Sequence, residues 1–236
     1  MSTLADPGRF ARVMFGGSMI GAALFMLGSS LAWPPIKSDD AAQLAVIAQH
    51  PTRFYLCTIL ILVSSMLFVP ALIGLMRRSA ERSPRLANLG GALSVLGALV
   101  AVGDSTTQLV IWQMVGRGAD RSQMAALLHR YDNATGASIV FNVGGIAIVV
   151  GIALLSIALY RSRAVPAWAA IGLVAGTVLN IVGFSASSVG ILIVSSVILL
   201  VSLGWIGLKE LRGELFHGAH GAPRAGSDEL LDPVQV

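Results

Sequence analysis

A single carboxylate lies inside the long apolar stretches of this 236-residue chain, and it is Asp104. A charged side chain in hydrocarbon is energetically costly and is usually kept for ligand binding or proton transfer. It begins the polar run DSTTQ (104–108), which ends at Gln108. Asn142 and Asn180 are polar residues within two other apolar stretches. Together these side chains could supply the polar groups of a site inside a membrane.

The depth of these residues suggests a pocket that opens to the outer side of the membrane. At 1.5 Å per helical residue, Asp104, Asn142 and Asn180 all fall in the outer half of their spans. Two histidines lie in the segments above them. The predicted ligand-binding residues are Asp104, Gln108, Asn142, Asn180, His50 and His129.

Two alternatives assign these residues no ligand. The polar side chains could simply hydrogen-bond between helices, which is worth only about 0.6 kcal/mol per contact. Asp104 could also reach the membrane interface, or cap a separate short helix that begins at Ser105.

Several kinds of chemistry can be excluded. The apolar stretches contain no histidine for haem and no lysine for a retinal Schiff base. The chain has no phosphate-binding glycine–lysine loop, no H-E-x-x-H and no G-x-S-x-G. His217 and His220 lie in a Gly-rich segment that is better explained as a solvated tail than as a metal site. We therefore expect no cofactor and no metal.

The elements that would hold the polar residues are membrane-spanning helices. The mean hydropathy is +0.79, with 55% hydrophobic and only 12% charged residues. Irregular backbone cannot face lipid, and a helix of about 20 apolar residues crosses a bilayer. The sequence predicts an all-α, polytopic membrane protein with one domain (1–212) and a flexible cytoplasmic tail (213–236). The six predicted spans are 13–33, 54–76, 86–110, 138–160, 166–184 and 188–208.

The distribution of Lys and Arg predicts that both termini are cytoplasmic. Basic residues are enriched in cytoplasmic loops. Of the 16 Lys and Arg residues, eleven would lie on the side of the termini and five on the other. The loop RRSAERSPR (77–85) is the strongest single indication. Residues that flank spans also account for the basic pI, so we expect no nucleic-acid partner.

Two segments between spans are predicted to be short amphipathic helices on the outer surface, 38–50 and 119–131. Each begins with capping residues and carries apolar residues on one face. Gln43 matches Gln123 when the two segments are aligned. This match suggests an internal parallel repeat of 41–97 and 121–179, although any two Ala- and Leu-rich hairpins look alike.

Glycine pairs at GxxxG spacing, Gly17/Gly21 and Gly172/Gly176, allow helices to approach closely. They predict either packing within the chain or a homodimer. The lipid bilayer is the other expected partner.

The segments DDAAQLAVIAQH, VPALIGLMRR, RSQMAALLHRYD and GWIGLKELR make the chain similar to small multi-pass membrane proteins of unknown function from actinobacteria. This resemblance covers most of the chain and implies a bacterial inner (plasma) membrane protein. It supplies no catalytic residues and no ligand.

The leading hypothesis is a non-enzymatic protein that binds or translocates a small hydrophobic molecule from the outer side. One alternative is an intramembrane acid/base enzyme that uses Asp104. Against it, general acid–base catalysis usually needs a second positioned group. The other alternative is a structural or regulatory membrane subunit.

Overall fold

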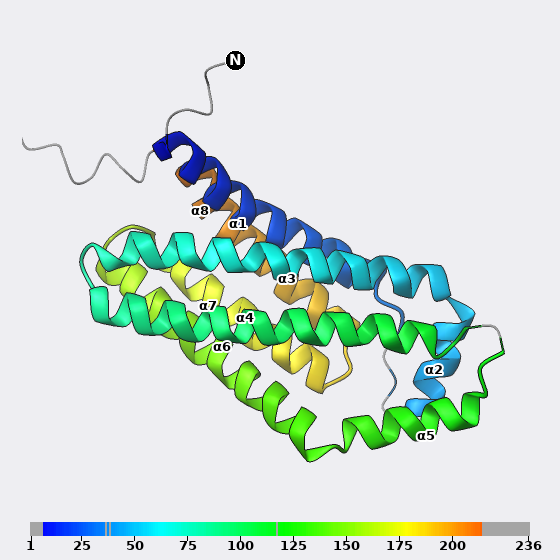
Figure 1. Cartoon of the computed structure of the whole chain (residues 1–236). Coiled ribbons are helices and arrows are strands. Elements are labelled where there is room, and N and C mark those ends of the chain that lie inside the picture. The colour runs from blue at the N-terminus through cyan, green and yellow to red at the C-terminus, as the bar shows by residue number, and fades with distance from the viewer. Residues whose placement is uncertain (1–6, 36, 38, 117, 214–236) are drawn as a thin grey trace, which may run out of the picture.

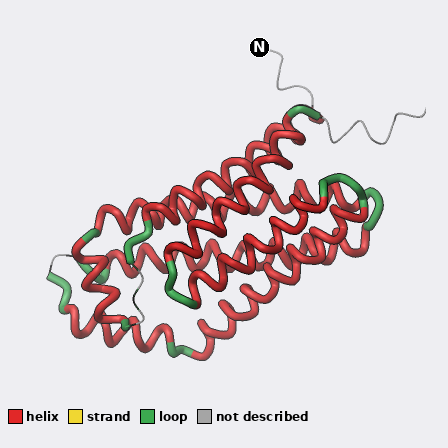
Figure 2. The backbone as a smooth tube through the Cα atoms, turned by 180° about the vertical axis from the view of Figure 1, so that it is seen from behind, coloured by secondary structure: helices red, strands yellow, loops and turns green. Residues whose placement is uncertain are grey.

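The protein is a bundle of long helices with two short helices across one end (Figure 1). The computed structural model describes residues 7–35, 37, 39–116 and 118–213, and the predicted tail lies almost entirely outside this part of the chain. Within the described residues every regular element is an α-helix (Figure 2), so the prediction of an all-α fold is confirmed. The helices are α1 (Pro7–Ala32), α2 (Asp40–Gln49), α3 (Pro51–Ala80), α4 (Pro84–Gln113), α5 (Arg121–Asp132), α6 (Thr135–Arg161), α7 (Ala167–Ser185) and α8 (Val189–Leu211).

Six of these helices are long and apolar enough to cross a membrane, as predicted. They contain 19 to 30 residues, which corresponds to roughly 28 to 45 Å of helix. Several extend beyond the predicted spans because polar first and last turns continue the helix outside the apolar core. Pro51 and Pro84, for example, occupy the first turns of α3 and α4, where a missing N–H costs no hydrogen bond.

The described chain begins and ends at the same end of the bundle, which we call the termini end (Figure 1). The opposite end carries α2 and α5, and we call it the capped end. Helix α1 packs between α3 and α8, and α4 packs between α3 and α6, while α7 lies on α8. The main apolar core runs between these helices and includes Met19, Leu72, Leu75, Leu155 and Leu203.

Helices α4 and α6 meet along a seam of small residues, which we call the glycine seam. A Cβ on Gly97 would lie 2.8 Å from the Gly144 carbonyl oxygen, and a Cβ on Gly90 would lie 2.9 Å from that of Gly151. Only residues without a side chain allow this approach. The last close contact toward the capped end is the one between Gly144 and Val100.

The two predicted surface helices are present as α2 and α5. Asp39 caps α2 by accepting from the Ala42 amide at 2.8 Å, and Asp120 accepts from the Ser122 amide at 2.9 Å. Leu44 and Ile47 of α2 and Leu128 of α5 are buried in a second apolar cluster with the ends of α1, α3 and α4. Their apolar faces therefore pack on protein, and the two helices close the end of the bundle.

The glycines at GxxxG spacing are used differently. Gly176 packs against Leu199 of α8, and Gly172 against Ser202, so this pair serves packing within the chain. Gly17 has nothing within 4 Å of a Cβ position. A homodimer through Gly17 and Gly21 stays a prediction, as does the superposition of 41–97 on 121–179.

The termini end is held by an ion pair that the sequence did not indicate. Arg78 of α3 donates from Nε to Glu210 Oε2 at 2.8 Å and from Nη2 to Oε1 at 2.6 Å. Both side chains are mostly buried, at 11% and 3% exposure. A two-point bond of this kind fixes orientation as well as distance, so α3 and α8 are joined rigidly.

The glycine seam leads to a stability prediction. Gly97→Ala should lower the free energy of unfolding in detergent by about 1–3 kcal/mol, because its Cβ overpacks the contact with α6. Gly103→Ala is the matched control on the same helix, because a Cβ there would meet nothing within 4 Å. It should be neutral or stabilising by up to about 1 kcal/mol. Equal effects of the two variants in detergent-unfolding curves would contradict the close packing of α4 on α6 at the glycine seam.

Candidate functional site

A cavity of about 930 Å³ lies beneath α2 and α5 at the capped end. It begins where the glycine seam ends, because Gly97, Val100 and Gly144 lie on its wall. Beyond that point α6 leans away from the bundle toward α5 (Figure 1). Residues from α2, α3, α4, α5, α6 and α7 line the cavity, together with Trp33 and Lys37 of the segment that joins α1 to α2.

Asp104 and Gln108 enter the cavity from α4. Helix α4 continues without a break through both residues, so Asp104 does not cap a helix that begins at Ser105. Asp104 lies nine residues before Gln113, which is about 14 Å below the last turn of α4. Its side chain is exposed and lines the cavity.

The hydroxyl groups beside Asp104 are engaged elsewhere. Ser105 donates to the Ala101 carbonyl at 2.8 Å, and Thr106 donates to the Gly103 carbonyl at 2.6 Å. The Thr107 hydroxyl lies 3.4 Å from the Tyr131 hydroxyl of α5. The polar run 104–108 thus contributes only Asp104 and Gln108 to the cavity wall.

Asn142 of α6 and Asn180 of α7 line the same cavity as Asp104 and Gln108. Four of the six residues singled out from the sequence are therefore brought together. The Asn142 side chain donates to the Ser138 carbonyl at 2.7 Å. In the described part of the chain neither asparagine is hydrogen-bonded to Asp104, so the four share a space and do not form a closed network.

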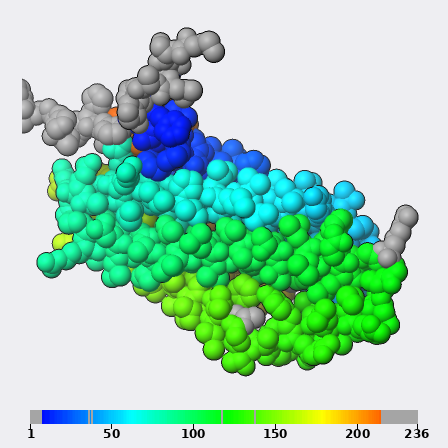
Figure 3. Space-filling view, in the orientation of Figure 1, coloured from blue at the N-terminus to red at the C-terminus, as the bar shows by residue number. Residues whose placement is uncertain are grey.

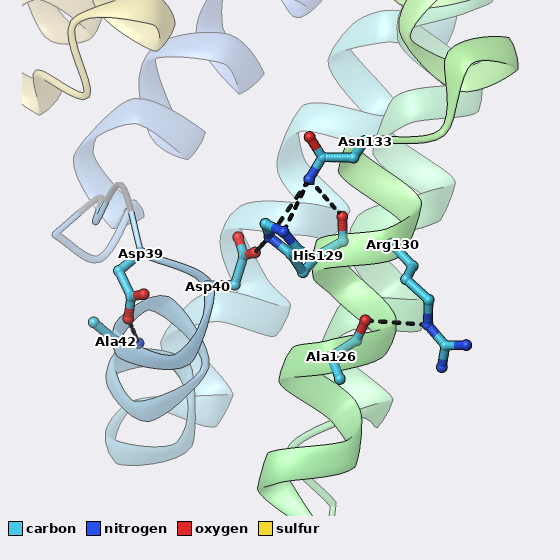
Figure 4. Close-up of polar contacts among 7 residues, drawn as sticks. All are labelled: Asp39, Asp40, Ala42, Ala126, His129, Arg130 and Asn133. Carbon is cyan, nitrogen blue, oxygen red and sulfur yellow. Dashed lines mark hydrogen bonds and ion pairs between the residues drawn. The ribbon is translucent and has the colours of Figure 1, made fainter.

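The two histidines lie differently from the other four residues. His50 ends α2 on the exposed surface and is not part of the cavity wall. His129 of α5 lies beside the cavity, and its Nδ1 is 3.1 Å from Asp40 Oδ2 (Figure 4). This contact joins α5 to α2 and also holds the Asp40 carboxylate, which does line the cavity.

Charged residues at the rim were missed from the sequence. Asp40, Asp132 and Lys37 all line the cavity. Each lies in or beside a predicted surface helix, and its position over the cavity depends on how α2 and α5 pack. Burial, and then the charge of Asp40, raises the pKa of the Asp132 carboxyl above its ordinary value of 3.8, whereas His129 lowers it.

Aromatic rings form a further part of the wall. Trp33 contacts Phe184 edge to face, with ring centroids 5.6 Å apart, and contacts Phe54 at 6.4 Å. All three line the cavity, as does Phe141. A smaller cavity of about 140 Å³ shares Asp104 and Asn180 and extends toward the core.

The donor set does not suggest a metal centre. Among the described residues there is no group of three or more His, Cys, Asp or Glu side chains placed to hold a metal ion. The sole cysteine, Cys57, is buried. What the arrangement offers is an apolar chamber with a few acidic and amide groups, as small-molecule sites commonly do.

Comparison with known proteins gives a family without an assigned activity. A family described as a domain of unknown function (DUF4386) matches residues 14–209. No curated protein and no solved structure matches the chain.

The acids at the rim lead to a pH-dependent prediction. Because the folded state raises the pKa of Asp132, its charged form costs stability at pH values above about 3.8 and costs nothing below that value. Asp132→Asn should therefore raise the Tm in detergent at about pH 7 and leave it unchanged at about pH 3.

Asp120→Asn is the control with the opposite sign. Hydrogen bonds from Ser122 and Gln123 lower the pKa of Asp120, so its charge stabilises the fold above about pH 3.8, and this contribution is lost as the pH falls. Replacing Asp120 should not raise the Tm at neutral pH. A Tm for Asp132→Asn at or below the wild-type value at pH 7 would contradict the cost of burying this charge beside Asp40.

Proposed function

The chain belongs to the DUF4386 family, and we propose that it binds a small, mostly apolar molecule in the cavity at the capped end. The observation that carries this proposal is the convergence of Asp104, Gln108, Asn142 and Asn180, from three helices, on one cavity of about 930 Å³. That volume suits a small-molecule ligand, for which pockets of about 300–1,000 Å³ are usual.

Access to the cavity is one-sided. Toward the termini end the glycine seam, the buried core and the pair of Arg78 with Glu210 leave the helices tightly packed. Toward the capped end the helices diverge, and only α2 and α5 cover the space. A molecule would therefore enter and leave near the capped end, and we propose binding in place of a continuous channel.

Binding is favoured over catalysis because Asp104 lacks a positioned partner. Among the described residues no side chain is hydrogen-bonded to Asp104, whereas acid–base catalysts are generally oriented by such a bond. Asp132 is a second carboxyl at the same cavity, so a reaction remains the alternative function. Turnover of a bound molecule would distinguish the two.

Our proposal includes an orientation in which the capped end faces outward in a bacterial plasma membrane of actinobacterial type. It is supported by the eleven basic residues on the side of the termini against five on the other side. The acidic rim formed by Asp40 and Asp132 would then face the outside. The cavity would open to the outer leaflet and to the medium above it.

A cavity-filling variant tests binding. The probe is dodecanol with a photoreactive diazirine on its chain, cross-linked to the purified protein in lipid vesicles. We expect labelled peptides from α4 and α6. Gly145 lines the cavity, and a side chain there would project into open space, so Gly145→Trp should fill the site and reduce labelling at least several-fold.

Gly103→Trp is the matched control, because Gly103 is equally open but is not part of the cavity wall. It should label like the wild type. Unchanged labelling in Gly145→Trp, with cross-links spread evenly over all long helices, would contradict the binding function.

The orientation is tested with single cysteines in intact cells. Cys57 is buried, so the wild type should not react with a membrane-impermeant maleimide. His50→Cys, at the capped end, should react from outside, and Glu81→Cys, at the termini end, should react only after lysis. Both parent residues are exposed. Labelling of Glu81→Cys in intact cells would show that the protein has the opposite orientation.

A further inference from the structure

We propose that the ligand of this cavity is an amphiphilic amine, with an apolar chain and a protonated amino group. The proposal rests on the binding function above and names the chemistry of the molecule bound. It follows from three separate features of the cavity: its charge, its aromatic rings and its opening along the side of α6.

The charge of the cavity wall is negative. Asp40, Asp104 and Asp132 face it, and Lys37 is the one basic residue of the described chain that lines it. Arg53 lies nearby, but its guanidinium donates to the carbonyls of Ala32 at 2.8 Å and Trp33 at 3.1 Å, so it closes the end of α1. Even if His129 beside Asp40 is protonated, three acids face two bases. The charge that lies deepest is that of Asp104.

Asp104 also lacks the hydrogen bonds that a carboxylate in this setting needs. No described residue donates to it, and a second carboxyl, Asp132, lines the same cavity. Gln108 and Asn180 face the same space, and no hydrogen bond of the described chain uses their side chains. An ammonium group offers N–H donors to all three and a positive charge to Asp104, which compensates the cost of a carboxylate in an apolar wall.

The aromatic rings favour a cation independently of the acids. Phe184 is 41% exposed on the wall and packs edge to face on Trp33, which is buried and contacts the buried Phe54 in the same way. Aromatic faces attract cations through their quadrupole, most strongly where water is excluded.

The apolar part of the ligand has a route into the lipid. Ile146 and Val150 of α6 line the cavity, and they are 65% and 43% exposed. Side chains so exposed on the wall indicate that the cavity is open along α6. The space-filling view shows the surface hollowed between α6 and α5 (Figure 3). The chain of an amphiphile can lie along α6 while its amino group reaches Asp104.

The test compares three photoreactive probes with the same twelve-carbon diazirine chain and different head groups: an amine, an alcohol and a sulfate. The full-length protein is reconstituted in phosphatidylcholine vesicles near pH 7. The amine should half-saturate labelling of α4 and α6 at a concentration about tenfold lower than the alcohol, and the sulfate should label least.

Variants separate the head-group contact from partitioning of the probes into the bilayer. Asp104→Asn should remove most of the advantage of the amine over the alcohol. Asp120→Asn removes an acid that is outside the cavity wall and should change labelling by neither probe. Asp132→Asn removes a second acid of the cavity wall and should reduce the advantage of the amine partially. This variant keeps the test decisive if Asp104→Asn fails to fold.

The outcomes distinguish this inference from the proposed function. Equal labelling by amine and alcohol, or an advantage of the amine that survives in both aspartate variants, would overturn the inference while binding stands. Preferential labelling by the sulfate would also overturn it. Failure of all three probes to label the cavity would overturn the binding function itself.

Discussion

The close contact of α4 with α6 is the constraint on which the rest of the site depends. Gly90 and Gly97 let the two backbones approach until carbonyl oxygens lie within 3 Å of where a Cβ would be. Gly144, against Val100, is the last glycine toward the capped end with such a contact to α4, and beyond it α6 leans away toward α5 (Figure 1). Two rigid helices that touch over one half of their length and part over the other necessarily enclose a wedge. The cavity is that wedge, closed above by α2 and α5.

The wedge explains how a carboxylate is retained in an apolar bundle. Asp104 lies just past the last close contact on α4, where the helices have separated enough to admit solvent or a ligand. Three turns nearer the termini end, a carboxylate would meet packed backbone and no partner. The acid that does lie in the packed part, Glu210, is held by Arg78 through two hydrogen bonds. The two acids thus show the two ways of keeping a charge, pairing it or opening a space for it.

Much of the fold could be predicted from the sequence because membrane helices follow simple length and hydropathy rules. The six spans and the two short helices were found, and the short helices were recognised from the capping residues at their starts. The common depth of Asp104, Asn142 and Asn180 followed from the rise per residue alone. The family match confirms a resemblance to proteins of unknown function, and the six apolar helices support a membrane protein. The contributions of Asp40 and Asp132 could not be predicted, because they depend on how α2 and α5 tilt over the bundle. The spacing of Gly90, Ser94 and Gly97 indicates a face on which another helix can pack closely. The sequence does not show that this helix is α6.

The most direct test of the account is the chemical accessibility of position 104. Asp104→Cys, in a background with Cys57→Ala, can be titrated in intact cells with membrane-impermeant thiol reagents of positive and negative charge. The account predicts reaction from outside, faster with the cationic reagent because Asp40 and Asp132 remain at the rim, and blocked when Gly145→Trp is added. A thiol at 104 that reacts with neither reagent, or only after lysis, would contradict a cavity that opens at the capped end.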